Sequence, residues 1–403
     1  MALDESDRSR RILLVDCDAF FVQVARLEDP EGAGKADLLL VGSSQTGRGV
    51  VTSASYGARR FGVRSAMPTA QALRLCPDAT VVGVPQRACS QKSREIKACL
   101  NDLSPIVQAA SIDEFYLDLM GTERLFGESL EVTARRIRES VLEATRISVS
   151  IGGGTRRMIA KLASGVAKPG GVHIVLAGEE LDFMKGLDLS DLPGVGPALV
   201  EALRKRGLVR VDEALGVQQA WLERWFGASR GRWLYRRIRG LDSSRVDARE
   251  PRKSISSERT FFQDLSSDED LERVLLRLCG SVTHTLRKSG LRTRTITVKL
   301  RDGDFKTCSR SRTVVEPLKT DGATFRIARE LLAELRNRRR TPARLLGVGL
   351  TNLSSDDDPL QFGLFEEKDP LEGHRERALG HVVDGLRERF GEGAVRPGRT
   401  IGD

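Results

Sequence analysis

Apolar residues along the chain occur in short runs, typical of buried strands, and in stretches of helical period. Short runs predict strands at 11–16, 80–84, 107–110, 115–119 and 147–151. Helical spacing predicts helices at 20–27, 69–76, 88–103, 129–145 and 156–167. Strands and helices mix here without regular βαβ repeats, so we predict an α+β multidomain fold with a mixed or antiparallel sheet.

The rest of the chain divides by the same pattern. Residues 178–240 are predicted to be all-helical, and polar residues 241–252 lack an apolar period and read as a linker. The aromatic residues of the helical region have helical spacing and are expected in its core; they are Trp221, Trp225, Trp233 and Tyr235.

A small α/β sandwich is predicted after the linker. Its expected elements are strands at 254–262, 293–301, 305–314 and 345–350, and helices at 268–288 and 320–338. Alternation from Thr293 to Lys299 puts polar and basic side chains on one face of its sheet.

Two acidic stretches, 15–21 and 111–118, interrupt strand-like runs. A carboxylate at the edge of a buried strand is costly unless a positive group neutralises it, and Mg²⁺ is the usual partner of hard oxygen ligands. Period-2 geometry places Asp16 and Asp18 on one strand face. Adjacent Asp113 and Glu114 can meet at one site only if a turn or a bulge re-aims one of them.

Residues 52–63 combine small hydroxyl residues, Tyr56 and two arginines at a probable strand-to-helix junction. Helix amides and arginines favour a polyphosphate, although ordinary capping and surface charge explain such a cluster equally well. Lys161, inside the next predicted helix, can reach back toward the acidic centre. Gly152–Gly154 lacks the spacing of a P-loop, so we expect a tight turn there.

The turn Pro193-Gly194-Val195-Gly196 precedes a helical stretch and is similar to a helix-hairpin-helix. Its amides would hold a DNA phosphate without reading sequence. The alternative is a plain turn between two helices.

Charge is distributed unevenly along the chain. The net charge is +9, and residues 251–350 hold 22 lysines and arginines against 12 acidic residues, whereas 354–403 hold 7 against 12. The basic segment is a candidate nucleic-acid surface, or else a solvated arginine-rich face.

Composition excludes other chemistries. The six cysteines are scattered and the chain has four histidines, which argues against a zinc site, a disulfide framework and a histidine base. No long apolar run and no N-terminal signal core are found, so we expect a cytoplasmic protein without a membrane partner.

The acidic C-terminal region contains the peptide Gln361-Phe362-Gly363-Leu364-Phe365. A polar tail offers no core for these aromatic rings, so the peptide is a plausible docking segment for an apolar pocket on a partner.

Taken together, these motifs resemble those of the Y-family translesion DNA polymerases, most closely the DNA polymerase IV class. The matching stretches cover about 11–353 in the family's order; they are 15–21, 53–63, 111–114, 160–163, 168–170, 192–196 and 252–254. Any one of them alone would be unspecific.

The resemblance implies a right-hand polymerase: palm (1–19 and 86–177), small fingers (20–85), helical thumb (178–240), linker (241–252), little finger (253–353) and tail (354–403). Primer-template DNA and a dNTP would be its substrates, two Mg²⁺ ions its cofactors, with Mn²⁺ as a substitute. We expect a monomer that adds dNTPs to a primer 3′ end without proofreading, in DNA damage tolerance.

The resemblance also assigns roles to single residues. Metal ligands would be Asp16, Asp113, Glu114 and the Cys17 backbone carbonyl, whereas the family's counterpart of Asp18 is not usually a ligand. Nucleotide contacts would be Phe20, Ser53, Tyr56, Arg59 and Lys161, with Phe21 as the steric gate against ribonucleotides. DNA contacts would be Gly194, Gly196, Lys253, Arg294 and Arg310. Contacts to a sliding clamp would be Gln361, Leu364 and Phe365.

The sequence departs from the family pattern at a few positions. Ser53 and Ser55 stand where Thr and Asn are commoner, 152–157 replaces a turn ending in Asn-Lys, and Phe362 stands where Leu is usual. A non-catalytic mutagenesis accessory protein is the alternative, but such proteins typically lose the acidic ligands. A cyclase or nuclease would leave the helix-hairpin-helix and the basic segment unexplained.

Overall fold

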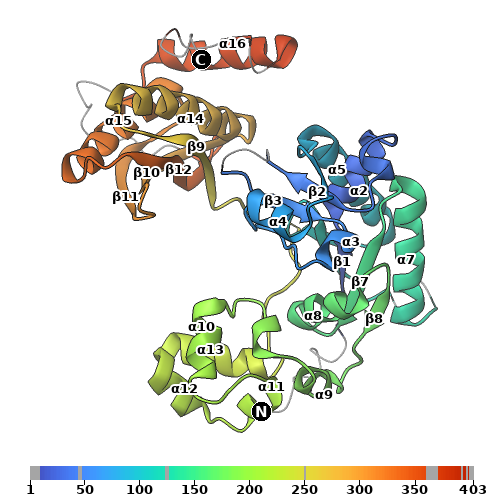
Figure 1. The fold of residues 1–403 in the computed structure, drawn as a ribbon. Helices are drawn as coiled ribbons and strands as arrows, with labels where there is room; N and C mark the ends of the chain where they lie inside the picture. Colours follow the sequence, from blue (N-terminus) through green and yellow to red (C-terminus); the bar gives the residue numbers. More distant parts are fainter. Residues whose placement is uncertain are drawn as a thin grey trace. The chain divides into compact units, whose positions relative to one another are not determined.

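The computed structural model describes residues 10–43, 48–122, 127–248, 251–359, 371–391, 394, 395 and 398. The chain forms two compact units, Met1–Glu250 and Pro251–Asp403, and each is described by itself (Figure 1).

A five-stranded sheet forms the centre of the first unit. Its strand order is β5-β6-β1-β7-β8, with β7 and β8 parallel and the other pairs antiparallel. The strands are β5 (Ile106–Ala109), β6 (Glu114–Asp118), β1 (Ile12–Cys17), β7 (Val149–Gly154) and β8 (Val172–Ile174). The predicted hairpin of β5 and β6 is confirmed.

Helices cover both faces of this sheet, which explains why every residue of β1 is buried. Leu13 and Val15 point into the core formed with α5 (Gln86–Leu103) and α7 (Leu130–Thr145). Ile12 and Leu14 point to the opposite face, where they cluster with Ala160 of α8 (Arg157–Ala167). Asp16 shares this second face by alternation, so it points toward α8.

The prediction of a tight turn at Gly152–Gly154 is wrong, because these glycines form the end of β7. A Cβ on Gly152 would lie 2.0 Å from the Ser164 amide nitrogen and 2.1 Å from the Ala160 carbonyl oxygen. Glycine is therefore required for α8 to pack directly on the sheet backbone.

A three-stranded sheet of order β3-β2-β4 lies beside the central sheet in sequence; β2 pairs antiparallel with β3 and parallel with β4. Its strands are β2 (Leu39–Gly42), β3 (Val51–Ala54) and β4 (Thr80–Val82). The associated helices are α2 (Phe20–Glu28), the 3₁₀ helix η1 (Ala33–Lys35), α3 (Tyr56–Arg59) and α4 (Thr69–Leu75).

The region 178–240 is helical, as predicted. It contains α9 (Glu180–Lys185), the 3₁₀ helix η2 (Leu189–Asp191), α10 (Pro197–Arg204), α11 (Val211–Leu215), α12 (Gln219–Phe226) and α13 (Ala228–Ile238). Trp225, Trp233 and Tyr235 pack against its core, but the core prediction is wrong for Trp221, which is 49% exposed. The element before the Pro-Gly-x-Gly turn is the short η2, not a full helix.

Residues 241–248 have no regular secondary structure, yet they are fixed on the central sheet. Val246 is buried among Ile12, Leu14, Tyr116 and Ala160. The Arg156 guanidinium donates to the Asp242 carbonyl (2.8 Å), and Arg157 donates to the Arg245 carbonyl (2.8 Å). This part of the predicted linker is therefore an anchored strap.

The second unit is a four-stranded antiparallel sheet of order β11-β10-β12-β9. The strands are β9 (Ser254–Leu265), β10 (Leu291–Asp302), β11 (Thr307–Leu318) and β12 (Ala343–Ser355). Helices α14 (Asp268–Lys288) and α15 (Asp321–Arg338) pack on one face (Figure 1). Helix α16 (His374–Phe390) is tied to α14 by ion pairs of Asp384 with Arg287 and His284.

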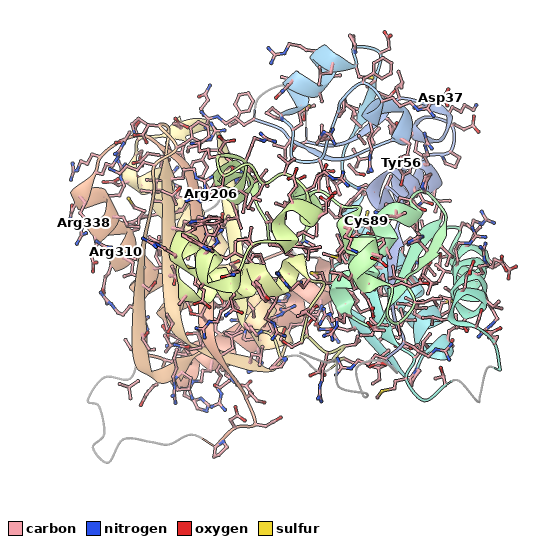
Figure 2. The ribbon with its side chains drawn as sticks, turned by 90° about the horizontal axis from the view of Figure 1, so that it is seen from below. Asp37, Tyr56, Cys89, Arg206, Arg310 and Arg338 are labelled. Atoms are coloured by element: carbon pink, nitrogen blue, oxygen red, sulfur yellow. The ribbon has the colours of Figure 1, made fainter. Side chains whose placement is uncertain are left out.

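The open face of this sheet is polar, as the alternation predicted, but it does not carry every basic residue expected there. Thr295, Thr297 and Lys299 alternate with the buried Ile296 and Val298, so they face away from the helices. Arg310 pairs in register with Val298 and lines a hollow together with Arg338 at the end of α15 (Figure 2). Arg310 thus belongs to the helix-covered side.

In the part of the chain that the structure describes, no helix is both long and apolar enough to cross a membrane.

Candidate active site

Asp16 and Glu114 are brought together by strand register. They are direct partners on the adjacent strands β1 and β6. Lys161 of α8 bridges them, with its Nζ 3.1 Å from Asp16 Oδ2 and 2.6 Å from Glu114 Oε1. Burial acts to lower the pKa of Lys161, but the Asp16 and Glu114 carboxylates outweigh it, so the pKa is raised and the ammonium stays charged. The expected reach of Lys161 is confirmed.

A second ammonium group occupies the other oxygen of Asp16. Lys168, directly after α8, places its Nζ 2.5 Å from Asp16 Oδ1. The Asp16 side chain is only 5% exposed, so two cations neutralise one buried carboxylate. The sequence reasoning quoted the Lys168-Pro169-Gly170 stretch but assigned Lys168 no role.

Asp113 lies in the turn between β5 and β6, one residue before β6 begins. The Cys17 amide donates to the Asp113 carbonyl (3.0 Å), which fixes this turn beside the end of β1. Ser111 Oγ donates to the Asp113 carboxylate (2.5 Å). Burial first, and then the carboxylates of Asp113, Asp16 and Asp18, raise the pKa of the Cys17 thiol, so that side chain stays neutral.

Asp18 does not share the environment of Asp16, and the sequence-based placement of the two on one strand face is wrong. Strand β1 ends at Cys17, and Asp18 begins the turn into α2. Its carboxylate is buried and accepts four hydrogen bonds, which come from Tyr56 Oη (3.1 Å), Ser148 Oγ (2.9 Å), Ser150 Oγ (2.7 Å) and the Gly170 amide (2.9 Å). With its oxygens used in this way, Asp18 holds the loops of the site together.

The junction of β3 and α3 places Tyr56 and Arg59 one turn apart. Burial, together with the nearby Asp18, raises the pKa of Tyr56 to about 12, so its hydroxyl is a donor at neutral pH. The Arg59 guanidinium lies 4.9 Å from the centre of the Tyr56 ring and donates to the Ala54 carbonyl (3.0 Å). Ser53 is buried on β3.

Ser55, one of the departures from the family pattern, is the N-cap of α3. Its hydroxyl accepts from the Ala58 amide (3.3 Å) and the Leu39 amide (3.1 Å) and donates to the Asp37 carbonyl (2.8 Å). Serine is a favoured N-cap residue, so it joins α3 to β2 without the longer side chain of asparagine.

Phe20 and Phe21 open helix α2 but have different surroundings. The Phe20 ring is fully buried in the core of the central sheet, which leaves its backbone for a ligand. Phe21 is half-buried and packs edge to face on Phe20, with 5.5 Å between ring centres. Helix N-terminal amides attract anions, so this turn suits a phosphate.

A cleft of about 760 Å³ opens next to this site and includes Asp18, Tyr56, Asp37 and Phe61 in its lining. Figure 2 labels Tyr56 and Asp37. Asp16, Glu114 and Lys161 are not in the lining, so the cleft adjoins the acidic centre without containing it.

The residues predicted to contact DNA are distributed over both units. Gly194 has a φ of +91°, and a Cβ there would lie 2.7 Å from the Trp233 ring, so the turn needs glycine; Gly196 is the N-cap of α10. Lys253 is exposed just before β9, and Arg294 is exposed at an irregularity in the β10 register. Gln361, Leu364 and Phe365 lie outside the described residues.

Whether these residues fit a divalent cation follows from their donor chemistry. Among the described residues, no three His, Cys, Asp or Glu side chains are arranged to hold a metal ion. Lys161 and Lys168 instead neutralise Asp16 and Glu114. All candidate donors are hard oxygen atoms, the kind that Mg²⁺ prefers, so the residues present fit this ion chemically.

Comparisons with known proteins identify the class of protein that this fold and site define. Residues 15–165 match the impB/mucB/samB family, and residues 252–364 match the C-terminal domain of that family. The chain therefore belongs to this family, the Y-family DNA polymerases.

Individual relatives narrow the comparison. The chain is 38% identical over 388 residues to a DNA polymerase IV of Caulobacter vibrioides, covering 96% of this chain and 93% of that protein. It is 35% identical over 389 residues to a DNA polymerase IV of Treponema denticola, covering 96% of each.

Solved structures agree with this comparison. The Y-family DNA polymerase chimera Dbh-Dpo4(243-245)-Dbh superposes with a TM-score of 0.76 at 26% identity, covering 85% of this chain and 98% of that one. An insertion ternary complex of Dbh DNA polymerase gives a TM-score of 0.61 at 27% identity, with the same coverage. The protein is a DNA-directed DNA polymerase of the translesion type, and an accessory protein without catalysis is not favoured.

Proposed function

We propose that Asp16, Asp113 and Glu114, with the Cys17 carbonyl, hold two Mg²⁺ ions at which a dNTP is added to a primer 3′ end. The observation that supports this most directly is the register of β1 and β6, which pairs Asp16 with Glu114 and leaves Asp113 in the adjoining turn. Mn²⁺, which accepts the same oxygen donors, is expected to substitute.

Bound divalent cations supply Lewis-acid chemistry, since they favour deprotonation of an attacking hydroxyl and neutralise a leaving pyrophosphate. The chain's own contribution is to position the triphosphate. Tyr56, Arg59 and Ser53 would bind its oxygens from the β3–α3 junction, and Lys161 would move from Glu114 to a phosphate oxygen once the cations neutralise the carboxylates. The backbone of Phe20 and the ring of Phe21 would contact the phosphates and the sugar.

DNA and a dNTP are proposed as the substrates because the structural relatives include an insertion ternary complex of Dbh DNA polymerase. The proposed DNA contacts combine the turn of Gly194 and Gly196 with Lys253, Arg294 and Arg310. Gln361, Leu364 and Phe365 are proposed to bind a sliding clamp. We further propose that the protein acts as a cytoplasmic monomer with the palm, fingers, thumb and little-finger boundaries predicted from the sequence.

The test is the double variant Asp113→Ala, Glu114→Ala. Primer extension in Mg²⁺ should fall below detection, while binding of a fluorescent primer-template stays unchanged, because cation binding is lost and the DNA surface is intact. A matched control, Glu139→Ala with Glu143→Ala, removes two carboxylates from the surface of α7 and should extend normally. Full activity in the Asp113/Glu114 variant would refute the assignment.

A further inference from the structure

Lys168 stands out because the proposed mechanism gives it no task although it contacts a proposed metal ligand. Its Nζ lies 2.5 Å from Asp16 Oδ1, and its side chain is 28% exposed, compared with 5% for Asp16. Lys161 takes the other oxygen of Asp16 at 3.1 Å. Both oxygens of this buried carboxylate are therefore held by ammonium groups.

The position of Lys168 is fixed by its neighbours in the chain. The Gly170 amide donates to Asp18 Oδ2 (2.9 Å) and to Ser150 Oγ (2.9 Å), and Arg138 Nη1 donates to the Gly170 carbonyl (2.5 Å). These bonds attach the segment after α8 to the end of the central sheet. The contact of Lys168 with Asp16 is thus built into the backbone.

Charge explains why such a contact is needed. Asp16, Asp18, Asp113 and Glu114 lie close to one another at the ends of β1 and β6. A buried carboxylate without a counter-charge is strongly destabilising. Asp18 is satisfied by neutral donors, but Asp16 is held by the two lysines, as described above.

We propose that Lys168 is a positioning residue that substitutes for a divalent cation at Asp16 in the metal-free enzyme and must withdraw from Oδ1 when the cation binds. This rests on the proposed role of Asp16 as a metal ligand. Lys161 has a second destination, the triphosphate, whereas Lys168 acts as an internal competitor of the metal. The exchange keeps the carboxylates neutralised before the cations and the nucleotide arrive.

The test is Lys168→Met in the full chain, which keeps the length of the side chain and removes its charge. In EDTA the variant should unfold at a lower temperature than the wild type, because Asp16 loses a counter-charge. Titration with Mg²⁺, and separately with Ca²⁺, followed by the unfolding temperature, should give a midpoint about tenfold lower, since a competing charged hydrogen bond is removed. Lys168→Arg should restore both values toward those of the wild type.

The control is Lys185→Met, which removes an exposed lysine that pairs with Asp182. It should change neither value. Should Lys168→Met fail to fold, Lys168→Gln provides the same two measurements with a shorter neutral side chain.

Three results would overturn the inference. An unchanged cation midpoint with an unchanged metal-free unfolding temperature would show that Lys168 does not compete. An unchanged or higher midpoint with a raised KM for dNTP would make Lys168 a substrate contact instead. If the wild type shows no cation response that Asp16→Asn removes, the metal assignment of Asp16 fails as well, and this result separates the two failures.

Discussion

Replacing Gly152 with alanine tests whether the close packing of α8 on β7 is what positions Lys161. The added Cβ would lie 2.0 Å from the Ser164 nitrogen and 2.1 Å from the Ala160 oxygen. Both are backbone atoms, so no side-chain rotation relieves the contact. Ala160 is adjacent to Lys161, and any displacement of α8 therefore moves the lysine away from Asp16 and Glu114.

The size of the effect follows from these distances. An ordinary contact requires α8 to move by roughly 1.4 Å, because the interior is close-packed and neither layer is compressible. Overpacking of this kind costs about 3 kcal/mol, the upper part of the usual range. For a unit of this size that corresponds to a fall in Tm of roughly 6–12 °C. Misplacement of a positioning group by about 1 Å also lowers the rate by roughly a hundredfold.

Thermal unfolding by circular dichroism and single-nucleotide primer extension measure the two effects. Gly165→Ala is the matched control in the same helix, since no described atom lies within 4 Å of its Cβ position. It should stabilise the protein by about 0.5–1 kcal/mol, as alanine does in a helix. Wild-type Tm and extension rate in Gly152→Ala would refute the reasoning.

Two further changes test other parts of the first unit. Phe21→Ala should let ribonucleotides be incorporated, because the half-buried ring beside Phe20 is the proposed barrier to a 2′-hydroxyl; competition between dNTP and rNTP measures this, and unchanged sugar selectivity would contradict the steric gate. Val246→Asp should lower Tm, because a polar group buried without partners costs roughly 2–7 kcal/mol. The exposed Ser243→Asp is its control, and equal unfolding temperatures would show that the strap is not anchored.

Most elements of both units were predictable because their apolar periods are long and regular. Helix α14 was predicted with the bounds that the structure has, and the hairpin of β5 and β6 was expected. The glycines of β7 were misread because a glycine triplet looks the same in a turn and in a strand that a helix must approach closely. Trp221 was misplaced because helical spacing shows which residues share a face but not whether another element covers it.

The candidate site was predictable as a set of residue types but not as a geometry. Asp16, Glu114 and Lys161 were identified from the sequence, and strand register brings them together. The separate role of Asp18 was not apparent, because its partners Ser148, Ser150 and Gly170 are more than 120 residues away. Val246 was likewise hidden in a polar segment.

By itself, the sequence determined the class of the protein, the order of its elements and the acidic, basic and glycine motifs, because these depend on local composition and spacing. The tertiary structure decided which carboxylate meets which cation. A hydrogen bond or ion pair between distant residues depends on strand register and on how closely a helix packs, and both are set by contacts across the whole unit. The neutralisation of Asp16 by Lys161 and Lys168 is a property of that packing.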